Sequence, residues 1–358
     1  MKTTLEDLGY TDKLQQLWMG HDPDNLEIGR VVAEHKERYL VKTTNSEFEA
    51  EITGNMRFTA NGREDFPAVG DWVTLVTYEP DFAIIHKILP RFSVLKRKAA
   101  GASGSIQIIA ANIDYAFLVQ AADRDFNINR LERYLTICHS AKVEPIIILT
   151  KTDLADEQQI SGMLGKLRSR IQEIPILAIS NETKDGYEAL DKFILKGKTY
   201  CMLGSSGAGK STLLNNLSGR TIMKTGEISQ VSQRGKHITS HREMIILENG
   251  GILIDNPGMR EVGIADSPGG LENTFDTIMS LAENCKFKDC THTQEIGCSI
   301  LEALERGKLD KNTYENYLKM EREREHYETS AAEKKRKEKI FGKIIKDYLE
   351  RDVKQRKP

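Results

Sequence analysis

Residues 204–211 form a glycine-rich motif that could bind phosphate groups. They fit the pattern G-x-x-x-x-G-K-S and lie between an apolar run and a helical run. In that context backbone N–H groups turn toward phosphate oxygens, the lysine reaches the β and γ oxygens, and the serine ligates Mg²⁺. A chance glycine-rich turn is the alternative. The expected phosphate-binding residues are Gly204, Ser205, Ser206, Gly207, Ala208, Gly209, Lys210, Ser211 and Thr212, with Lys210 also catalytic and Ser211 a magnesium ligand.

A second motif, residues 150–153, indicates which base the nucleotide carries. It reads Thr-Lys-Thr-Asp after the apolar run 145–149, like the N/T-K-x-D element of GTPases. The Asp153 carboxylate can accept both N1–H and the N2 amino group of guanine, a donor pair that adenine lacks. Alone, the motif is equally typical of a helix N-cap; beside the phosphate motif it predicts a GTP site. We expect Thr150, Lys151 and Asp153 to bind GTP, with Ser180, beside Asn181, either behind the guanine ring or in a plain turn.

Two further segments could respond to the γ-phosphate. Asp255 and Gly258 fit D-x-x-G, in which the carboxylate binds Mg²⁺ through water and the glycine N–H meets the γ-phosphate; a simple Asn-Pro-Gly turn is the alternative. Residues 235–240 form a polar segment suited to a mobile switch that closes a hydroxyl group onto Mg²⁺. Met259 comes directly after the D-x-x-G motif, where many GTPases place a water-orienting glutamine. We therefore expect slow intrinsic turnover and an orienting group from elsewhere.

The order of these motifs is unusual. In most GTPases the phosphate motif precedes the base-reading motif, whereas here Asp153 precedes Lys210 by 57 residues. A domain tolerates such reconnection because its termini lie close together at the surface. The chain therefore leaves the nucleotide domain directly after the D-x-x-G motif, and we expect the γ-phosphate to influence the C-terminal domain.

A cluster of soft metal ligands lies downstream. Cys285, Cys290, His292 and Cys298 supply three thiolates and one imidazole within 14 residues. This donor set suits one tetrahedral Zn²⁺, and four protein ligands leave no open position, so the site would be structural. Such a site stabilises a segment too short to bury its own core. Free buried thiols beside an unrelated histidine are the alternative.

The surrounding sequence predicts the elements that position these motifs. Short β-type runs between residues 28 and 88 suggest a small barrel, with the five-stranded oligonucleotide-binding (OB) barrel favoured over another barrel or a sandwich. Alternating strands and amphipathic helices then predict a mostly parallel α/β sheet, and helices surround the cysteines. The expected ranges are an N-terminal arm (1–27), the barrel (28–98), a linker (99–107), the permuted GTPase domain (108–266), a mainly α-helical zinc-binding domain (267–328) and a basic tail (329–358).

Composition limits the class of protein. The chain has 358 residues, of which 39% are hydrophobic and 29% charged, as in ordinary multi-domain globular proteins. Its apolar runs are far too short to cross a membrane, and no secretory signal is recognisable, so we expect a cytoplasmic protein. The net charge is −2, yet residues 330–358 hold 11 Lys and Arg against 5 Asp and Glu. A basic tail of this kind favours a phosphate backbone or an acidic surface.

Together, the motifs in this order behind a small β-barrel resemble the circularly permuted ribosome small subunit-dependent GTPase A family. The resemblance covers residues 28–328. It implies an OB barrel, a permuted GTPase domain, a zinc domain, and GTP hydrolysis stimulated by the small ribosomal subunit during late maturation. It also points to His237 as the catalytic water-orienting residue, with a loop histidine that only positions phosphate or RNA as the alternative. It leaves Thr239 as a magnesium ligand beside Ser211 and Asp255. Two positions depart from the family pattern: Thr150 replaces the commoner asparagine, and His237-Ile238-Thr239-Ser240 replaces His-Thr-Thr-Thr.

The sequence leaves three functions open. The first is a GTPase that binds the small ribosomal subunit and its ribosomal RNA, and whose hydrolysis of GTP to GDP times its release from the particle. We expect such a protein to be a monomer away from membranes. The second is an RNA-binding module that nucleotide merely stabilises. The third is a P-loop ATPase or kinase. Turnover of GTP or ATP with and without small subunits separates them.

Overall fold

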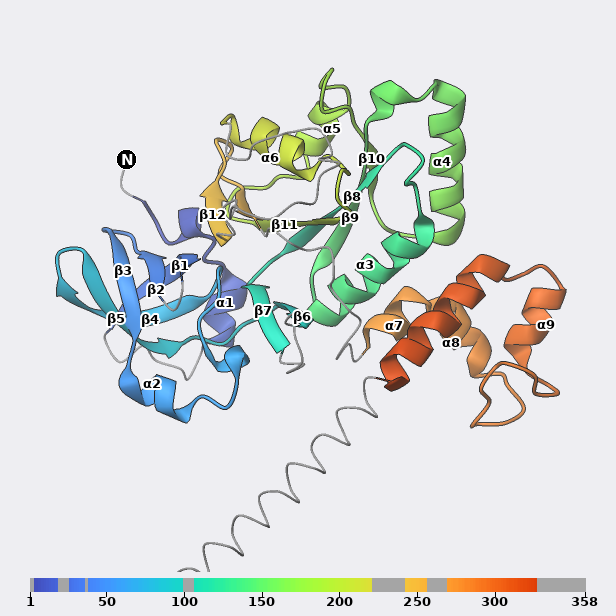
Figure 1. The fold of residues 1–358 in the computed structure, drawn as a ribbon, viewed down its shortest axis with the longest axis horizontal. Helices are drawn as coiled ribbons and strands as arrows, with labels where there is room; N and C mark the ends of the chain where they lie inside the picture. Colours follow the sequence, from blue (N-terminus) through green and yellow to red (C-terminus); the bar gives the residue numbers. More distant parts are fainter. Residues whose placement is uncertain are drawn as a thin grey trace, which may run out of the picture.

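The structure is a computed structural model that describes residues 3–18, 26–35, 38–98, 106–220, 242–255 and 269–326. A β-barrel, an α/β domain and a helical C-terminal region succeed one another along the chain (Figure 1). Several predictions fall outside the described residues. These concern residues 235–240 with His237 and Thr239, Gly258, Met259 and the basic tail 329–358.

The barrel has five strands: β1 (Glu27–His35), β2 (Arg38–Lys42), β3 (Glu47–Ile52), β4 (Trp72–Glu79) and β5 (Phe82–Ile88). They pair in the order β1-β2-β3-β5-β4, and β1 also pairs with β4, which closes the sheet. Helix α2 (Gly54–Thr59) connects β3 to β4. Alternate side chains, among them Val31, Val41 and Ile85, fill the interior. The predicted OB-like barrel is confirmed.

The segment after the barrel forms a separate hairpin. β6 (Val94–Lys98) pairs antiparallel with β7 (Ile106–Ala111), not with a barrel strand. Residues 94–98, which we placed in the barrel, and 106–107, which we placed in the linker, therefore belong to this ribbon. Leu95 on β6 and Ile109 and Ala110 on β7 are buried in the α/β core, so the ribbon packs there, which sequence texture alone did not indicate.

The N-terminal arm packs against the barrel. The arm contains the 3₁₀ helix η1 (Glu6–Leu8) and helix α1 (Asp12–Leu17). A second 3₁₀ helix, η2 (Arg63–Asp65), lies outside the arm, between α2 and β4. Trp18 lies edge-on to Trp72, with ring centroids 5.8 Å apart, and its indole N–H donates to the Pro90 carbonyl at 3.1 Å. Aromatic pairs of this geometry add to the stabilisation from burial alone. The arm is thus an integral part of the fold.

The α/β domain is built on a six-stranded sheet in the order β10-β9-β8-β11-β13-β12. Five strands run parallel, and β12 is antiparallel to β13, as the predicted hairpin requires. Its strands are β8 (Tyr115–Ala121), β9 (Glu144–Thr150), β10 (Ile176–Ala178), β11 (Thr199–Gly204), β12 (Arg242–Ile246) and β13 (Ile252–Asp255). Its helices are α3 (Ile128–Ala141), η3 (Thr152–Leu154), α4 (Glu157–Arg170), α5 (Tyr187–Asp191) and α6 (Lys210–Ser218).

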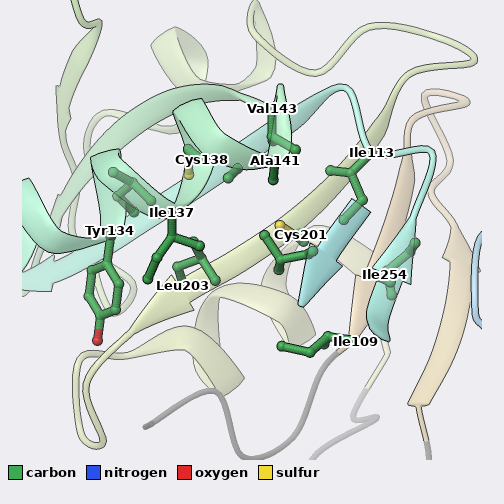
Figure 2. Close-up of a cluster of buried hydrophobic side chains, with 14 of the residues drawn as sticks. Ile109, Ile113, Tyr134, Ile137, Cys138, Ala141, Val143, Cys201, Leu203 and Ile254 are labelled. Atoms are coloured by element: carbon green, nitrogen blue, oxygen red, sulfur yellow. The ribbon is translucent and has the colours of Figure 1, made fainter. Parts of the chain in front are cut away.

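Each face of this sheet has its own core. On β11, Cys201 and Leu203 face α3, as Figure 2 shows for the cluster that includes Ile137 and Cys138. Tyr200 and Met202, which alternate with them along β11, belong to the core on the opposite face, beneath α5 and α6. Strand residues alternate between faces, and because both faces are covered, the strands are apolar throughout. Burial raises the pKa of the Cys201 thiol to about 12, which makes it an inert core residue.

The barrel and the α/β domain share one continuous sheet. β1 pairs antiparallel with β12, so that the barrel extends the six-stranded sheet to eleven strands. Next to this junction lies Arg30, which is completely buried. It donates to the carbonyls of Leu8 at 2.5 Å and Asn112 at 3.0 Å, and to the Thr199 hydroxyl at 2.9 Å. Burial lowers its pKa to about 10, so the side chain stays charged at neutral pH.

Replacing Arg30 with methionine should lower the free energy of unfolding by about 3–5 kcal/mol. The reason is that buried acceptors in three segments would lose their donors, each at a cost of about 1–3 kcal/mol. Urea denaturation measures the change. Arg38→Met on the neighbouring strand is the matched control, because this arginine is 66% exposed and forms only surface ion pairs. Equal stability of the two variants would contradict the role of Arg30.

The C-terminal region is helical, as predicted, and packs on α3. It contains α7 (Gly270–Thr274), α8 (Asp276–Ala282), α9 (Ser299–Glu305) and a helix over residues 311–326. Gly270 lies so close to α3 that a Cβ atom there would overlap Ser140 and the Thr136 carbonyl. Thr274 Oγ1 lies 3.0 Å from His139 Nδ1. The region is therefore anchored to the α/β domain. Among the residues described, no helix is long and apolar enough to span a bilayer.

Candidate nucleotide site and metal centre

The phosphate motif connects β11 to α6. Gly207 and Gly209 adopt left-handed conformations, with φ of 77° and 88°, which L-residues with side chains rarely adopt. Lys210 opens α6, and its ammonium group donates to the carbonyls of Gly204 at 2.8 Å and Ser205 at 2.6 Å. The strand-loop-helix context that the motif requires is therefore present, and the lysine is held over its own loop.

The base-reading motif contacts the phosphate motif directly. The completely buried Thr150, at the end of β9, donates its hydroxyl hydrogen to the Ala208 carbonyl at 2.7 Å. Thr150 therefore ties the two loops together. The two motifs, far apart in the sequence, form one site because β8, β9 and β11 are neighbours with parallel directions.

The Asp153 side chain is exposed but fixed in place. The Ser180 hydroxyl donates to Asp153 Oδ1 at 2.6 Å, so the two residues we assigned to base recognition meet. Lys151 takes a left-handed backbone conformation, with φ of 60°, and its ammonium group lies 3.0 Å from Asp123 Oδ2. The Asp123 ion pair was not apparent from the sequence. Together these contacts hold one carboxylate edge ready to accept hydrogen bonds.

A second tether joins the loop after β10 to the phosphate motif. Asn181 Nδ2 donates to the Gly209 carbonyl at 3.1 Å, and a Cβ atom on Gly209 would lie 2.8 Å from this nitrogen. Asn216 on α6 donates to the Asn181 carbonyl at 3.0 Å, while the Tyr187 hydroxyl donates to Asn181 Oδ1 at 2.8 Å. The sequence pointed to Asn181 but not to its partners, because neither Asn216 nor Tyr187 belongs to a recognisable motif. The two ends of the candidate site are thus linked at two points.

Replacing Thr150 with valine should weaken GTP binding about tenfold, or ~1.4 kcal/mol, because the buried Ala208 carbonyl would lose its donor. Titration with GTP by calorimetry measures the loss. Thr152→Val is the matched control, since the Thr152 side chain has no hydrogen bond among the described contacts. An unchanged affinity in Thr150→Val would show that the tether does not position the nucleotide.

Asp255 ends β13, the strand that pairs with β11. This places it at the same edge of the sheet as the phosphate motif, since parallel strands end on the same side. The rest of the D-x-x-G motif, including Gly258, lies outside the described residues, as do His237 and Thr239. Their assignments stay predictions.

The structure gathers all four predicted metal ligands into one cluster. The sulfur and ring nitrogen atoms of Cys285, Cys290, His292 and Cys298 all lie within 4.8 Å of one another. Cys285 Sγ is 3.9 Å from Cys298 Sγ, and His292 Nδ1 is 3.6 Å from both sulfurs. All five cysteines of the chain are free thiols. The cluster could therefore hold a metal ion.

The loop that carries His292 is braced by its own polar groups. Glu295 accepts hydrogen bonds from the backbone N–H of Thr291 at 2.8 Å and of Thr293 at 2.9 Å. Hydrogen bonds from Thr291 lower the pKa of this carboxyl far below its usual value. Tyr314, on the helix over 311–326, donates to the His292 carbonyl at 2.6 Å. These contacts hold His292 in a left-handed conformation, with φ of 61°, and support the orientation of its ring.

The fold and the paired loops define a circularly permuted P-loop GTPase with an N-terminal OB-like barrel and a C-terminal Cys₃His cluster. The sequence model of the RsgA GTPase family matches residues 88–265. A small ribosomal subunit biogenesis GTPase RsgA 1 of Bacteroides thetaiotaomicron is 37% identical over 96% of both chains, and an RsgA 2 of Listeria monocytogenes serotype 4b is 40% identical over 99% of both. The chain belongs to the RsgA GTPase family.

Solved structures agree with this assignment. The crystal structure of YjeQ from Thermotoga maritima matches with a TM-score of 0.63 and 26% identity, covering 82% of this chain and 96% of that one. The structure of YloQ, described as a circularly permuted GTPase, matches in fold with a TM-score of 0.60, covering 84% of this chain and 95% of that one at 24% identity. The predicted family, fold class and GTPase activity are confirmed.

Proposed function

We propose that this GTPase binds the small ribosomal subunit and acts in its late maturation in the cytoplasm, as a monomer whose turnover the subunit stimulates. The names of its relatives support the partner. The observation that carries the nucleotide assignment is the 2.7 Å hydrogen bond from Thr150 to Ala208. It holds the base-reading loop against the phosphate loop, so one GTP can contact both.

In this proposal the residues of the chain divide the work of hydrolysis. Asp153 accepts the guanine N–H groups, and the backbone N–H groups of residues 204–211 surround the phosphates. The Lys210 ammonium group donates to two carbonyls of its own loop in the structure, and it would donate to the β and γ oxygens when GTP is bound. Ser211, Thr239 and Asp255 would hold Mg²⁺, which supplies positive charge to the phosphate oxygens when bound. Gly258 donates its backbone N–H to the γ-phosphate.

His237 is our candidate for orienting the attacking water, because Met259 cannot do so and an imidazole accepts or donates a proton at neutral pH. His237→Ala should lower turnover stimulated by small subunits at least about tenfold without weakening GTP binding. Single-turnover hydrolysis and GTP titration measure the two quantities. Unchanged stimulated turnover would remove His237 from the mechanism.

Zinc is the metal that we propose for the Cys₃His cluster. Tetrahedral Zn²⁺ with Zn–S of about 2.3 Å and Zn–N of about 2.0 Å separates two sulfurs by about 3.8 Å and a sulfur from a nitrogen by about 3.5 Å. The separations among Cys285, His292 and Cys298, 3.9 Å between the two sulfurs and 3.6 Å from each sulfur to the nitrogen, fit these values. The Cys290 sulfur lies within 4.8 Å of the other ligand atoms. Four protein ligands leave no position for substrate, so zinc would stabilise the fold of the C-terminal region.

One assay tests the proposed function. Hydrolysis of GTP and of ATP is measured with and without isolated small subunits, together with cosedimentation at modest salt. We expect GTP hydrolysis to be slow alone and faster with subunits, and GTP-loaded protein to cosediment. Turnover that small subunits do not change would instead favour an RNA-binding module that nucleotide only stabilises.

A further inference from the structure

A pocket of about 380 Å³ lies where the C-terminal region meets the start of α3. Asn127 and two arginines, Arg130 and Arg133, line it from the GTPase domain. Asn316 and Lys319 line it from the helix over 311–326, which Figure 1 shows beside α7 and α8. With Asn129, the wall therefore carries three cations and three amides from two regions of the chain, and Met320 is the single apolar residue of its lining.

Two of the three cations are not neutralised. Arg133 forms an ion pair with Glu323. Within the described ranges, neither Arg130 nor Lys319 has an ion-pair partner. Glu315 also borders the pocket, but its carboxylate lies 3.7 Å from the ammonium group of Lys311. The pocket thus presents uncompensated positive charge from Arg130 and Lys319.

The walls are held by buried polar contacts. Glu132 on α3 is only 2% exposed and accepts from Asn316 Nδ2 at 2.6 Å. Arg170, at the end of α4, donates to both Glu132 carboxylate oxygens at 2.7 Å. Asn316 also donates to the Asn129 carbonyl at 3.3 Å. Because these groups fix the helix over 311–326 against α3, a ligand would not have to order the pocket on binding.

We propose that this pocket binds a phosphate group of an RNA backbone, so that one RNA segment contacts the GTPase domain and the C-terminal region together. Guanidinium groups match phosphate oxygens in geometry, and amides with cationic side chains supply most protein contacts to nucleic-acid backbones. All of the lining residues except Met320 are polar or charged, and this composition favours an anionic ligand over an apolar protein segment. The inference rests on the proposed function for the identity of the RNA.

The test is the salt dependence of binding by the full-length double variant Arg130→Gln with Lys319→Gln. Affinity for isolated small subunits, and for protein-free ribosomal RNA from them, is measured across a salt series. Each phosphate that is no longer neutralised makes the plot of log affinity against log salt less steep by roughly 0.7–0.9, so we expect the steepness to decrease by about that amount for the one phosphate in the pocket. At low salt, affinity should fall at least about tenfold. Zinc content and intrinsic GTP turnover should match the unaltered protein.

A double variant of Lys166→Gln with Lys192→Gln is the control, because it removes the same charge from exposed residues outside the pocket. An unchanged slope in the pocket variant, or an equal decrease in the control, would overturn the inference. Displacement of RNA by polyglutamate but not by polyuridylate would identify an acidic protein as the occupant and also overturn it. If the unaltered protein binds no small subunits, the proposed function fails, and the slopes on protein-free RNA still decide for or against the pocket.

Discussion

Replacing Asp153 with asparagine should weaken GTP binding by about 10²–10⁴-fold and strengthen binding of xanthosine triphosphate. The carboxylate accepts two guanine N–H groups, and hydrogen bonds to a charged group contribute about 1.5–3 kcal/mol each. An asparagine amide instead donates to the 2-oxo group of xanthine. In the unaltered protein the Ser180 hydroxyl donates to Asp153 Oδ1 at 2.6 Å. The Oδ1 atom of an asparagine can accept the same hydrogen bond, so the variant side chain should keep its position. Competition between the two nucleotides measures the exchange of specificity.

Asp156→Asn is the matched control for this experiment. Asp156 caps α4 only three residues further on, accepting from the Gln159 backbone N–H at 2.7 Å. Asparagine caps helices as well as aspartate does, so this variant should bind GTP normally. Loss of GTP affinity in Asp153→Asn without a gain for xanthosine triphosphate would mean that the carboxylate supports the loop and does not read the base.

Replacing Cys290 with serine should reduce bound zinc from one ion per chain to near zero and unfold the C-terminal region. Structural zinc contributes about 10–16 kcal/mol to the folding of small domains, whereas the apolar core of so small a region rarely supplies more than about 3–5 kcal/mol. Atomic emission spectroscopy measures the metal, and limited proteolysis measures the exposure of residues 269–326. Intrinsic GTP turnover should persist, because the phosphate motif lies in another region of the fold.

Cys138→Ala provides the control for the metal experiment. Cys138 is completely buried in α3, away from the cluster, so its replacement leaves a small cavity but should retain one zinc ion per chain. A Cys290→Ser protein that keeps stoichiometric zinc would refute the proposed ligand set. A different metal in the unaltered protein would refute the identity of the ion alone.

Local patterns were enough to predict the elements and most of the candidate site. The phosphate motif and the base-reading motif each come after an apolar strand and Asp255 ends one, and parallel strands place their carboxyl ends at one edge. The four metal ligands lie within 14 residues, so their clustering could be predicted without knowing any contact between distant segments. Thr150 stands where asparagine is commoner, and the residue type alone did not reveal whether its hydroxyl reaches the phosphate motif. The structure shows that it does.

Contacts between distant segments could not be predicted in this way. Arginine is normally exposed, so nothing in the sequence singled out Arg30 as a buried residue. The tether from Asn181 to Asn216 joins two elements whose polar residues fit no motif. Nor could periodicity assign β6 to a ribbon with β7 instead of the barrel, because apolar alternation specifies which face of a strand is buried but not its partner.

The pairing of β1 with β12 has a consequence for how the molecule can be divided. An edge strand offers bare N–H and C=O groups to other chains, and here the barrel conceals that edge of the nucleotide-binding sheet. Each of the two parts thus acts as the protective cover of the other. Removal of the barrel would expose unpaired backbone groups along β12, so we do not expect the α/β domain to be an independent enzyme. We expect the barrel and the α/β domain to unfold in a single cooperative transition.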